Sequence, residues 1–408
     1  IPPEQATQLH EWFYRHWSVH KQWSLTWFHH WMRNPSEALA WWWTMHRFTL
    51  KKRQIRKARA LLEWWQEVAL NDAERRRIGN QLWAAAHSAL GIALWETPVA
   101  PRASALLAAI EHFQSALRVY TETDFPTEWA NTQHCLGNAY AYMPIGDRSE
   151  NLRKAIECFQ NALRVYTETD FPVEWALTQN NLGIAYAQLP TGNRRENLRK
   201  AMECYQNALR VYTESDFPVD WARTLLNVGA AYRILPTEDW SENLRKAMEC
   251  YQNALRVFTE TDFPVEWATT LNNLGNLLFY LPTEDWGQNL LRAIECYQNA
   301  LRVRTETNFP YEWARTLNNL GLAYAYLPSG DRGENLLRAI GFYQNALRVF
   351  TETDFPYEWA NTQNNLGSAY AELPMGDREA NLRRAIECYQ NALRVYTEAN
   401  FPLEWART

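Results

Sequence analysis

A 46-residue period runs through most of the chain and constrains the fold more than any other feature. The segment AIECFQNALRVYTETDFPVEWA begins at Ala155, and near-copies begin 46 residues apart at Ala201, Ala247, Ala293, Ala339 and Ala385. Tryptophan repeats with the same period at Trp83, Trp129, Trp175, Trp221, Trp267, Trp313, Trp359 and Trp405. A repeat of this size cannot bury its apolar face alone, so we expect neighbouring copies to stack.

Each copy contains the signals of two helices joined by a turn. In one copy, Pro310 and Glu312 fit the first turn of a helix, and Pro328 ends that helix. Apolar residues recur along it at Trp313, Leu317, Leu320 and Tyr324. Asp331 and Glu334 then form a capping box, which begins a second helix. The same box recurs as Asp147/Glu150, Asn193/Glu196, Asp239/Glu242 and Asp285/Gln288.

These signals predict an all-α fold. Counted from Leu82, the chain holds seven full repeats and a truncated eighth over residues 404–408. We predict a right-handed α-solenoid of seven helix-turn-helix repeats over residues 82–408, preceded by an irregular helical N-terminal cap over residues 1–81. Since the truncated copy stops inside a predicted helix and the chain begins with Ile1, we expect the native chain to extend beyond both ends.

The repeat resembles the tetratricopeptide repeat. The positions that carry the resemblance are Leu320, Gly321, Tyr324, Ala339, Tyr343 and Ala346. The family unit has about 34 residues, and the extra residues here fall in the two connections of each repeat. The long repeat also resembles those of kinesin light chains, and more closely the bacterial arrays that are often fused to a CHAT protease domain or a signalling ATPase. No such domain is visible in this sequence.

An asparagine pair recurs in the first helix of most copies, although asparagine is a poor helix residue. On a helical wheel the pair lies away from the apolar stripe, on the side that lines the concave groove in the family that the chain resembles. We therefore predict a row formed by Asn181, Asn227, Asn273, Asn319 and Asn365. A second row, interrupted by Leu226, would comprise Asn180, Asn272, Asn318 and Asn364.

The amide side chain of asparagine offers a donor and an acceptor, which match the two polar groups of a peptide backbone. The resemblance implies that such a row holds an extended peptide. An alternative interpretation is that the asparagines hydrogen-bond between neighbouring repeats and set the curvature of the array. Additional contacts to the peptide are expected from Arg223, Arg315, Arg233, Tyr142, Tyr280 and Tyr326. Trp240 and Trp286, in the turns, form either a second contact patch or a contact with a neighbouring turn.

Residues 1–81 do not follow the period, and they carry ten of the 21 tryptophans. This much aromatic surface is expected to pack on the first repeat as a cap, or to mediate self-association with another chain. His16 and His20, with His29 and His30, have the spacing of a metal site, but exposed or stacked histidines explain them better. The basic segment from Arg47 to Arg59 suggests nucleic acid or an anionic surface, but a solvated helix face is the more common explanation.

The remaining sequence features argue against an enzyme. We find no phosphate-binding loop, nucleophile elbow, dinucleotide fingerprint or zinc spacing, and therefore expect no cofactor and no metal. Cysteine recurs in the apolar stripe at Cys158, Cys204, Cys250, Cys296 and Cys388, as expected of inert thiols in a reducing cytoplasm. No apolar run is long enough to span a membrane, and a net charge of −5 favours no particular partner.

Two hypotheses for the function follow. In the first, the chain is a non-catalytic scaffold whose asparagine-lined groove binds a peptide or protein segment. In the second, it is the sensor or regulatory region of a larger signalling or defence protein, of the CHAT protease or STAND ATPase type, whose catalytic domain is not part of this chain.

Overall fold

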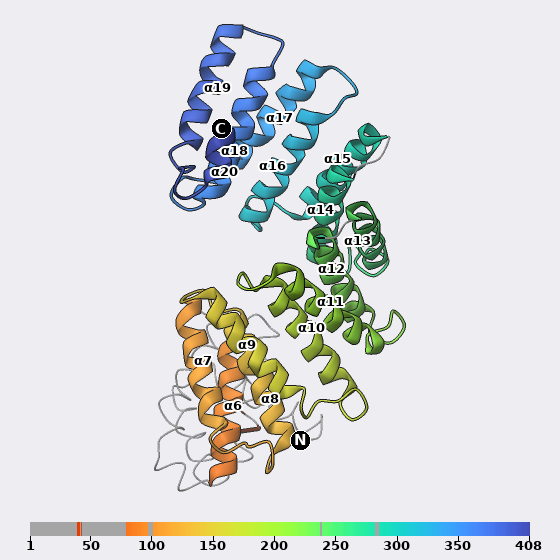
Figure 1. Ribbon diagram of the computed structural model, residues 1–408, viewed down its shortest axis with the longest axis vertical. Coiled ribbons are helices and arrows are strands. Elements are labelled where there is room, and N and C mark those ends of the chain that lie inside the picture. Colours follow the sequence, from red (N-terminus) through yellow and green to blue (C-terminus); the bar gives the residue numbers. More distant parts are fainter. Residues whose placement is uncertain (1–38, 41, 43–78, 97–100, 237–238, 282–284) are drawn as a thin grey trace, which may run out of the picture. The chain divides into compact units, whose positions relative to one another are not determined.

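The structure is a computed structural model, and it describes residues 39–40, 42, 79–96, 101–236, 239–281 and 285–408 (Figure 1). Every regular element among these residues is an α-helix. The first helices of the hairpins are α6 (Asn80–Glu96), α8 (Pro126–Ala141), α10 (Pro172–Gln188), α12 (Pro218–Ile234), α14 (Pro264–Tyr280), α16 (Pro310–Tyr326), α18 (Pro356–Glu372) and the short α20 (Pro402–Arg407). The second helices are α7 (Arg102–Ala116), α9 (Arg148–Ala162), α11 (Arg194–Val211), α13 (Trp240–Ala254), α15 (Trp286–Val303), α17 (Arg332–Ala346) and α19 (Arg378–Ala392).

The fold is an α-solenoid of helical hairpin repeats, as the sequence predicts. Each first helix from α6 to α18 packs along the second helix of its own hairpin, and within each unit the second helices α7, α9, α13, α15 and α17 pack on the next first helix. By its contacts the chain divides into two compact units, unit 1 (Ile1–Val211) and unit 2 (Tyr212–Thr408). The division falls between two hairpins, after the last residue of α11. The domain boundary predicted at residue 81 stays a prediction, because residues 43–78 lie outside the described part.

The helix starts confirm the sequence signals. Each first helix that follows a complete connection begins with proline at its first position, preceded by phenylalanine at the N-cap. Each second helix from α9 onward follows an Asp or Asn. The Asp331 side chain accepts a hydrogen bond from the Glu334 backbone N–H at 2.8 Å, and Asn193 accepts one from Glu196 at 3.2 Å. These caps satisfy backbone donors that the helix itself leaves unpaired.

A glycine in each first helix allows the hairpin to close. A Cβ added at Gly275 would lie 2.7 Å from the Tyr297 ring, so only glycine leaves room for the ring between the two helices. The same contact joins Gly91 to Phe113, Gly137 to Phe159, Gly183 to Tyr205, Gly229 to Tyr251, Gly321 to Tyr343 and Gly367 to Tyr389. The close approach expected of this glycine is thus a contact with the aromatic residue of the second helix.

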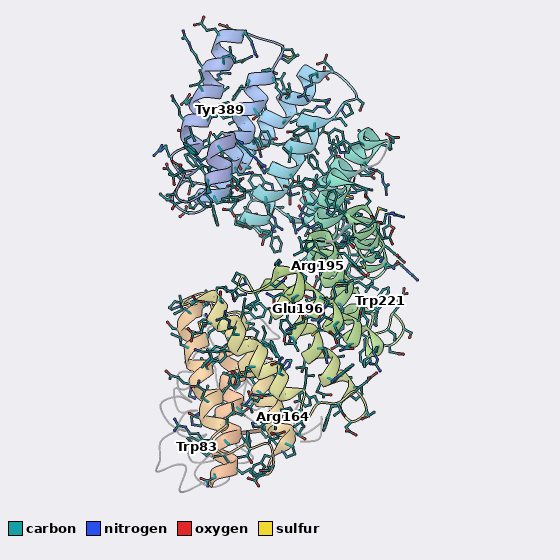
Figure 2. The ribbon with its side chains drawn as sticks, in the orientation of Figure 1. Trp83, Arg164, Arg195, Glu196, Trp221 and Tyr389 are labelled. Carbon is teal, nitrogen blue, oxygen red and sulfur yellow. The ribbon has the colours of Figure 1, made fainter. Side chains whose placement is uncertain are left out.

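The tryptophans of the first helices connect successive repeats. Trp129 packs with Val119 and Phe125 on one side, and with Val165 and Phe171 on the other. Surface ion pairs reinforce the same boundaries, as between Arg164 (Figure 2) and Glu122 at 2.7 Å, and recur as Arg210–Glu168, Arg256–Glu214, Arg302–Glu260, Arg348–Glu306 and Arg394–Glu352. These exposed pairs contribute little each, so the aromatic contacts carry more of the coupling between repeats.

Of the tryptophan-rich N-terminal region, the structure describes only residues 39–40 and 42 before residue 79. Trp42 is fully buried in a cluster with Leu90, Leu106 and Phe113, which belong to α6 and α7, the helices of the first hairpin. Its ring therefore packs against both helices of the first hairpin. The predicted histidine pair and the basic segment lie outside the described residues. Among those that are described, no helix is long and apolar enough to span a bilayer.

Candidate functional site

The second asparagine of each pair lies half-buried on the first helices. Asn181 Nδ2 donates to Asn138 Oδ1 of the preceding first helix at 3.0 Å, within unit 1. Asn319 Nδ2 donates to Asn276 Oδ1 in the same way at 2.9 Å, within unit 2. At these two positions the amides connect neighbouring repeats, as in the alternative interpretation of the pair.

The first asparagine of a pair faces the next first helix. Asn272 lies on α14 and is fully buried, and its Oδ1 accepts a hydrogen bond from Thr316 Oγ1 of α16 at 3.2 Å. In unit 1, His134 occupies the equivalent position and hydrogen-bonds Thr178 Oγ1 at 2.8 Å. The expectation that Asn272 would contact a ligand is therefore corrected, because a fully buried side chain has no surface to offer.

Three amides form a network between α16 and α18. Asn318 Nδ2 donates to Asn361 Oδ1 at 3.4 Å. Asn365 Nδ2 lies 3.3 Å from Asn318 Oδ1 and also 3.3 Å from Asn361 Oδ1. Asn364 is half-buried beside them, and its backbone carbonyl accepts a hydrogen bond from Ser368 at 3.1 Å. All of these side chains retain partial exposure, so the network lies at the surface of the two helices.

Asn273 differs from the other members of its row. It is half-buried, and among the described residues its side chain has no hydrogen-bond partner. The residue that would pair with it, on the pattern of Asn181 and Asn319, is Ala230, which has no polar side chain. Asn180 donates to Asn181 Oδ1 at 3.4 Å, and Asn227 is half-buried. Asn273 is therefore a half-exposed amide with both its donor and its acceptor available.

The predicted arginines of this surface have different surroundings. Arg223 Nη2 donates to Glu266 Oε1 at 2.8 Å, and this hydrogen bond lowers the pKa of the Glu266 carboxyl. Arg315 is exposed, and its guanidinium lies over the Tyr311 ring at 5.9 Å. Arg233 is half-buried at the end of α12. Arg315 therefore remains free to meet an anion, whereas Arg223 already has a carboxylate partner.

The predicted tyrosines end their first helices with large exposed surfaces. Tyr142 is 60% exposed, Tyr280 53% and Tyr326 55%. In unit 2, Phe279 contacts both Tyr280 and Tyr326 edge-on, with ring centroids 5.0 and 5.9 Å apart. Such half-exposed aromatic groups are typical of surfaces that bind other proteins. We call the side of the first helices of unit 2 that carries Asn273, Asn319, Tyr280 and Tyr326 the first-helix face.

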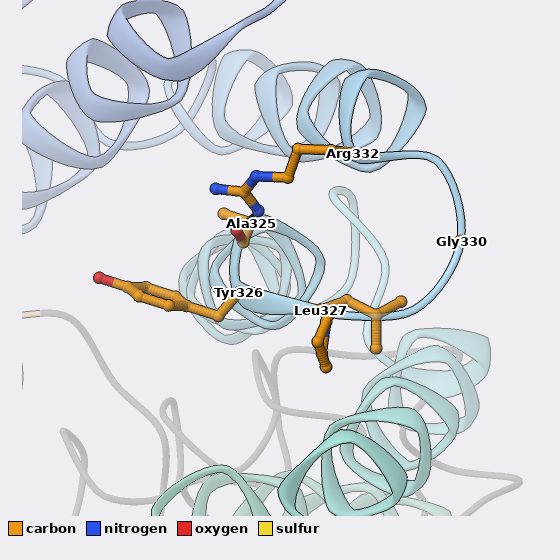
Figure 3. Close-up of a pocket in the computed structure, with 6 residues that line it drawn as sticks. Ala325, Tyr326, Leu327, Gly330 and Arg332 are labelled. Carbon is orange, nitrogen blue, oxygen red and sulfur yellow. Dashed lines mark hydrogen bonds between the residues drawn. The ribbon is translucent and has the colours of Figure 1, made fainter.

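The two turn tryptophans behave differently from each other. Trp286 Nε1 donates to the Phe279 carbonyl at 3.0 Å, and its ring lies 6.3 Å from that of Tyr326. Trp286 is thus packed against its own and the next repeat. Trp240 remains 42% exposed. In the other described turns an arginine takes the place of the tryptophan. One of them, Arg332, reaches over the end of α16 and bonds the Ala325 carbonyl, closing one side of a shallow pocket beside Tyr326 (Figure 3).

Titratable groups of the described residues do not form a reactive constellation. Burial raises the pKa of the Cys158 and Cys204 thiols to about 12, which keeps them protonated and unreactive at neutral pH. Among the described residues, no three His, Cys, Asp or Glu side chains are grouped so that they could hold a metal ion.

Sequence reasoning missed two sets of residues. Asn138, Asn276 and Asn361 supply the acceptors of the amide network, although they lie outside the predicted pairs. Two of them directly follow the helix glycine in the motif LGN, which was the available signal. The second set is a single residue, Arg304, which is a buried arginine at a position that is aromatic in the other copies. Aligning the copies column by column would have revealed it.

Comparisons with solved structures identify the class of fold. The apo form of the quorum sensor NprR from B. thuringiensis aligns over 97% of this chain and 94% of its own, with a TM-score of 0.59 and 14% identity. A STAND signal-transduction ATPase with a tetratricopeptide repeat sensor, from Pyrococcus horikoshii, aligns over 88% of this chain and 53% of its own, with a TM-score of 0.56 and 16% identity. A Rap protein complexed with competence and sporulation factor aligns over 91% and 95%, with a TM-score of 0.53 and 14% identity.

The chain thus has the fold of tetratricopeptide-like repeat proteins. At these identities the likeness concerns the fold alone. No family model matches the sequence, and no curated protein matches it either.

Proposed function

We propose that the chain is a non-catalytic scaffold that binds an extended protein segment along its first-helix face. The observation that carries the proposal is the combination of Asn273 with Tyr280 and Tyr326. Asn273 and Tyr280 are seven residues apart on α14, so they lie on one side of the helix, two turns apart. The amide is available to a peptide backbone, and the exposed rings offer flat apolar surface beside it.

The comparisons support a binding role. One structural neighbour is a Rap protein in complex with competence and sporulation factor, and another is a quorum sensor. Both have the same class of fold over nearly all of this chain. Binding of a protein or peptide partner is therefore the role that agrees best with fold and surface together.

A second candidate is the sensor region of a larger signalling or defence protein. The observation that favours it is the likeness to the STAND ATPase, which carries a tetratricopeptide repeat sensor. This chain covers 53% of that protein. The two candidates share the binding surface and differ in what the binding event controls.

Two asparagine substitutions separate binding from interlocking of repeats. Asn273→Ala removes an amide that has no partner among the described residues, so we expect unchanged thermal stability and about tenfold weaker binding. Asn319→Ala removes the donor to Asn276, so we expect the free energy of unfolding to fall by about 1 kcal/mol. Thermal denaturation and titration calorimetry, with a peptide selected from a random display library, measure both quantities.

The comparison between the two variants decides the role of the row. Weaker binding by Asn273→Ala at an unchanged melting temperature supports a peptide-binding surface. If both variants bind the selected peptide as the unmodified chain does, the asparagines only join repeats and the proposed surface is wrong.

A further inference from the structure

Arg304 is an exception within the repeat. It follows the last residue of α15 and is only 4% exposed. The equivalent positions in the other repeats hold buried aromatic rings: Tyr120, Tyr166, Tyr212, Phe258, Phe350 and Tyr396. Packing at this position therefore does not require an arginine. A buried guanidinium normally destabilises a fold unless a negative group compensates its charge.

The partners of Arg304 are neutral. Its Nη1 donates to Thr316 Oγ1 at 3.0 Å, and its Nη2 donates to Thr269 Oγ1 at 3.1 Å. Each of these hydroxyls also lies within 2.8 Å of the backbone carbonyl one helical turn earlier. No carboxylate of the described residues lies within 4.0 Å of the guanidinium. Burial, with the nearby positive charge of Arg315, lowers the pKa of Arg304 to about 10, and the Glu312 carboxylate opposes this shift.

The neighbouring amide adds a second unmatched donor. Asn272 is fully buried, and its Oδ1 already accepts a hydrogen bond from Thr316. Its Nδ2 is also buried and has no hydrogen-bond partner among the described residues. Buried donors are rarely left in this state. The cluster around Thr316 thus holds more N–H donors than acceptors, and it carries a positive charge without a counterion.

This cluster adjoins the first-helix face, because Thr269 and Arg315 lie one helical turn before Asn273 and Asn319. Thr269 on α14 is half-buried, and Arg315 occupies the equivalent position on α16, where it is exposed. On α12 the same position holds Arg223, which is paired with Glu266. Arg315 has no such carboxylate within ion-pair distance among the described residues. Two guanidinium groups without a carboxylate partner, Arg304 buried and Arg315 exposed, therefore lie near each other. Thr269 of α14 accepts a hydrogen bond from the buried one.

We propose that Arg304, Arg315 and Thr269 form a subsite for a carboxylate carried by the segment that binds the first-helix face. The inference rests on the proposed function. A carboxylate only accepts hydrogen bonds, so it supplies what the cluster lacks, and the guanidinium fork matches its two oxygens. Arg315 makes the first contact at the surface, while Arg304 stabilises the bound charge from below. The subsite selects a segment with an acidic residue between α14 and α16.

The rival explanation is that Arg304 only ties α14 to α16 through the two threonine hydroxyls. Arg304→Tyr and Arg304→Phe separate the two, because aromatic residues occupy the equivalent positions of the other repeats and both variants are expected to fold. Arg302→Tyr is the matched control, since it removes an exposed arginine from the same helix, where Arg302 pairs with Glu260.

The first experiment uses acetate alone as a probe for the carboxylate. The melting temperature of the full chain is followed while acetate replaces chloride at constant ionic strength. We expect a saturable rise for the unmodified chain and for Arg302→Tyr, and none for Arg304→Tyr or Arg304→Phe. Equal acetate dependence in all four proteins would overturn the subsite. A larger rise with inorganic phosphate than with acetate would overturn its assignment to a carboxylate.

The second experiment tests whether a bound segment supplies the carboxylate. Random heptapeptides are selected by display on the unmodified chain and on Arg304→Tyr. We expect aspartate or glutamate to be enriched at one position only with the unmodified chain, and the selected peptides to bind Arg304→Tyr about tenfold more weakly. If the selected peptides show no acidic preference, the carboxylate subsite is overturned while the proposed binding function stands. A selection that yields no peptide contradicts the proposed function, and the acetate titration then decides the site by itself.

Discussion

At the scale of single residues, the contacts that glycine and asparagine make explain why the first helices contain these two poor helix formers. Glycine in a helix costs up to about 1 kcal/mol relative to alanine, and here it makes room for an aromatic ring of the second helix. The sequence predicts close approach at this glycine, because the residue recurs at a fixed place beside leucine. It does not name the ring, since that contact depends on how the hairpin closes.

A pair of glycines in unit 2 tests this account. We expect Gly275→Ala to lower the free energy of unfolding by about 1–3 kcal/mol, because the added methyl group would press on Tyr297. Gly341 lies within α17 and has no atom within 4 Å of the Cβ position. Gly341→Ala should therefore stabilise the chain by about 0.5–1 kcal/mol. Urea denaturation measures both, and equal effects of the two substitutions would contradict the packing role.

The asparagines show what a sequence alone leaves open. Their position away from the apolar stripe follows from helical spacing, and the half-buried Asn181, Asn273 and Asn319 agree with it. Whether an amide meets a ligand or a neighbouring repeat depends on one side chain of the preceding first helix. That side chain is Asn138 before Asn181 and Ala230 before Asn273. Asn272, in contrast, is buried between first helices, because the contact between α14 and α16 covers part of the polar side as well.

At the scale of helices, the boundaries were largely predictable, because proline and the capping aspartates act locally. The contacts that join one hairpin to the next were less predictable, because they combine residues from three helices. Trp359 illustrates this. It packs in one cluster with Leu317 and Phe350, and in another with Ala392 and Tyr396. A single side chain therefore couples two successive repeats.

Substitution of this tryptophan measures the coupling. We expect Trp359→Ala to lower the free energy of unfolding by about 3 kcal/mol, because it removes the ring from both clusters. Arg394→Gln, which breaks the exposed ion pair with Glu352 across the same boundary, should cost about 1 kcal/mol at most. Chemical denaturation of both variants provides the comparison. A larger loss from Arg394→Gln would show that charge, not aromatic packing, joins the repeats.

At the scale of the whole molecule, a repeat's stability depends on its neighbours. The period predicts the number of hairpins and their stacking. It could not predict the division into two units, since the copies on either side of residue 211 have nearly the same sequence. Position within the array also changes burial. Ile340 in α17 is 6% exposed, whereas Ile386, at the same place in α19, is 55% exposed.

These two isoleucines form a matched pair. Ile340→Ala should cost about 2–5 kcal/mol, because it leaves a cavity between two hairpins. Ile386→Ala should cost about 0.5 kcal/mol or less, because its side chain is largely exposed. The difference in melting temperature between the two variants of this 408-residue chain measures how much more stability Ile340→Ala loses than Ile386→Ala. Similar losses would mean that α19 is covered in solution.

The central claim is that a protein segment binds along the first-helix face, and side-chain footprinting tests it most directly. A selected peptide is added, hydroxyl radicals oxidise the exposed side chains, and mass spectrometry reads the extent at each residue. Tyr280 and Tyr326 are more than half exposed on that face, whereas Leu291 and Leu337 are exposed on the second helices α15 and α17. The account predicts that the peptide protects both tyrosines and leaves both leucines unchanged. Protection of the leucines with unchanged tyrosines would contradict it.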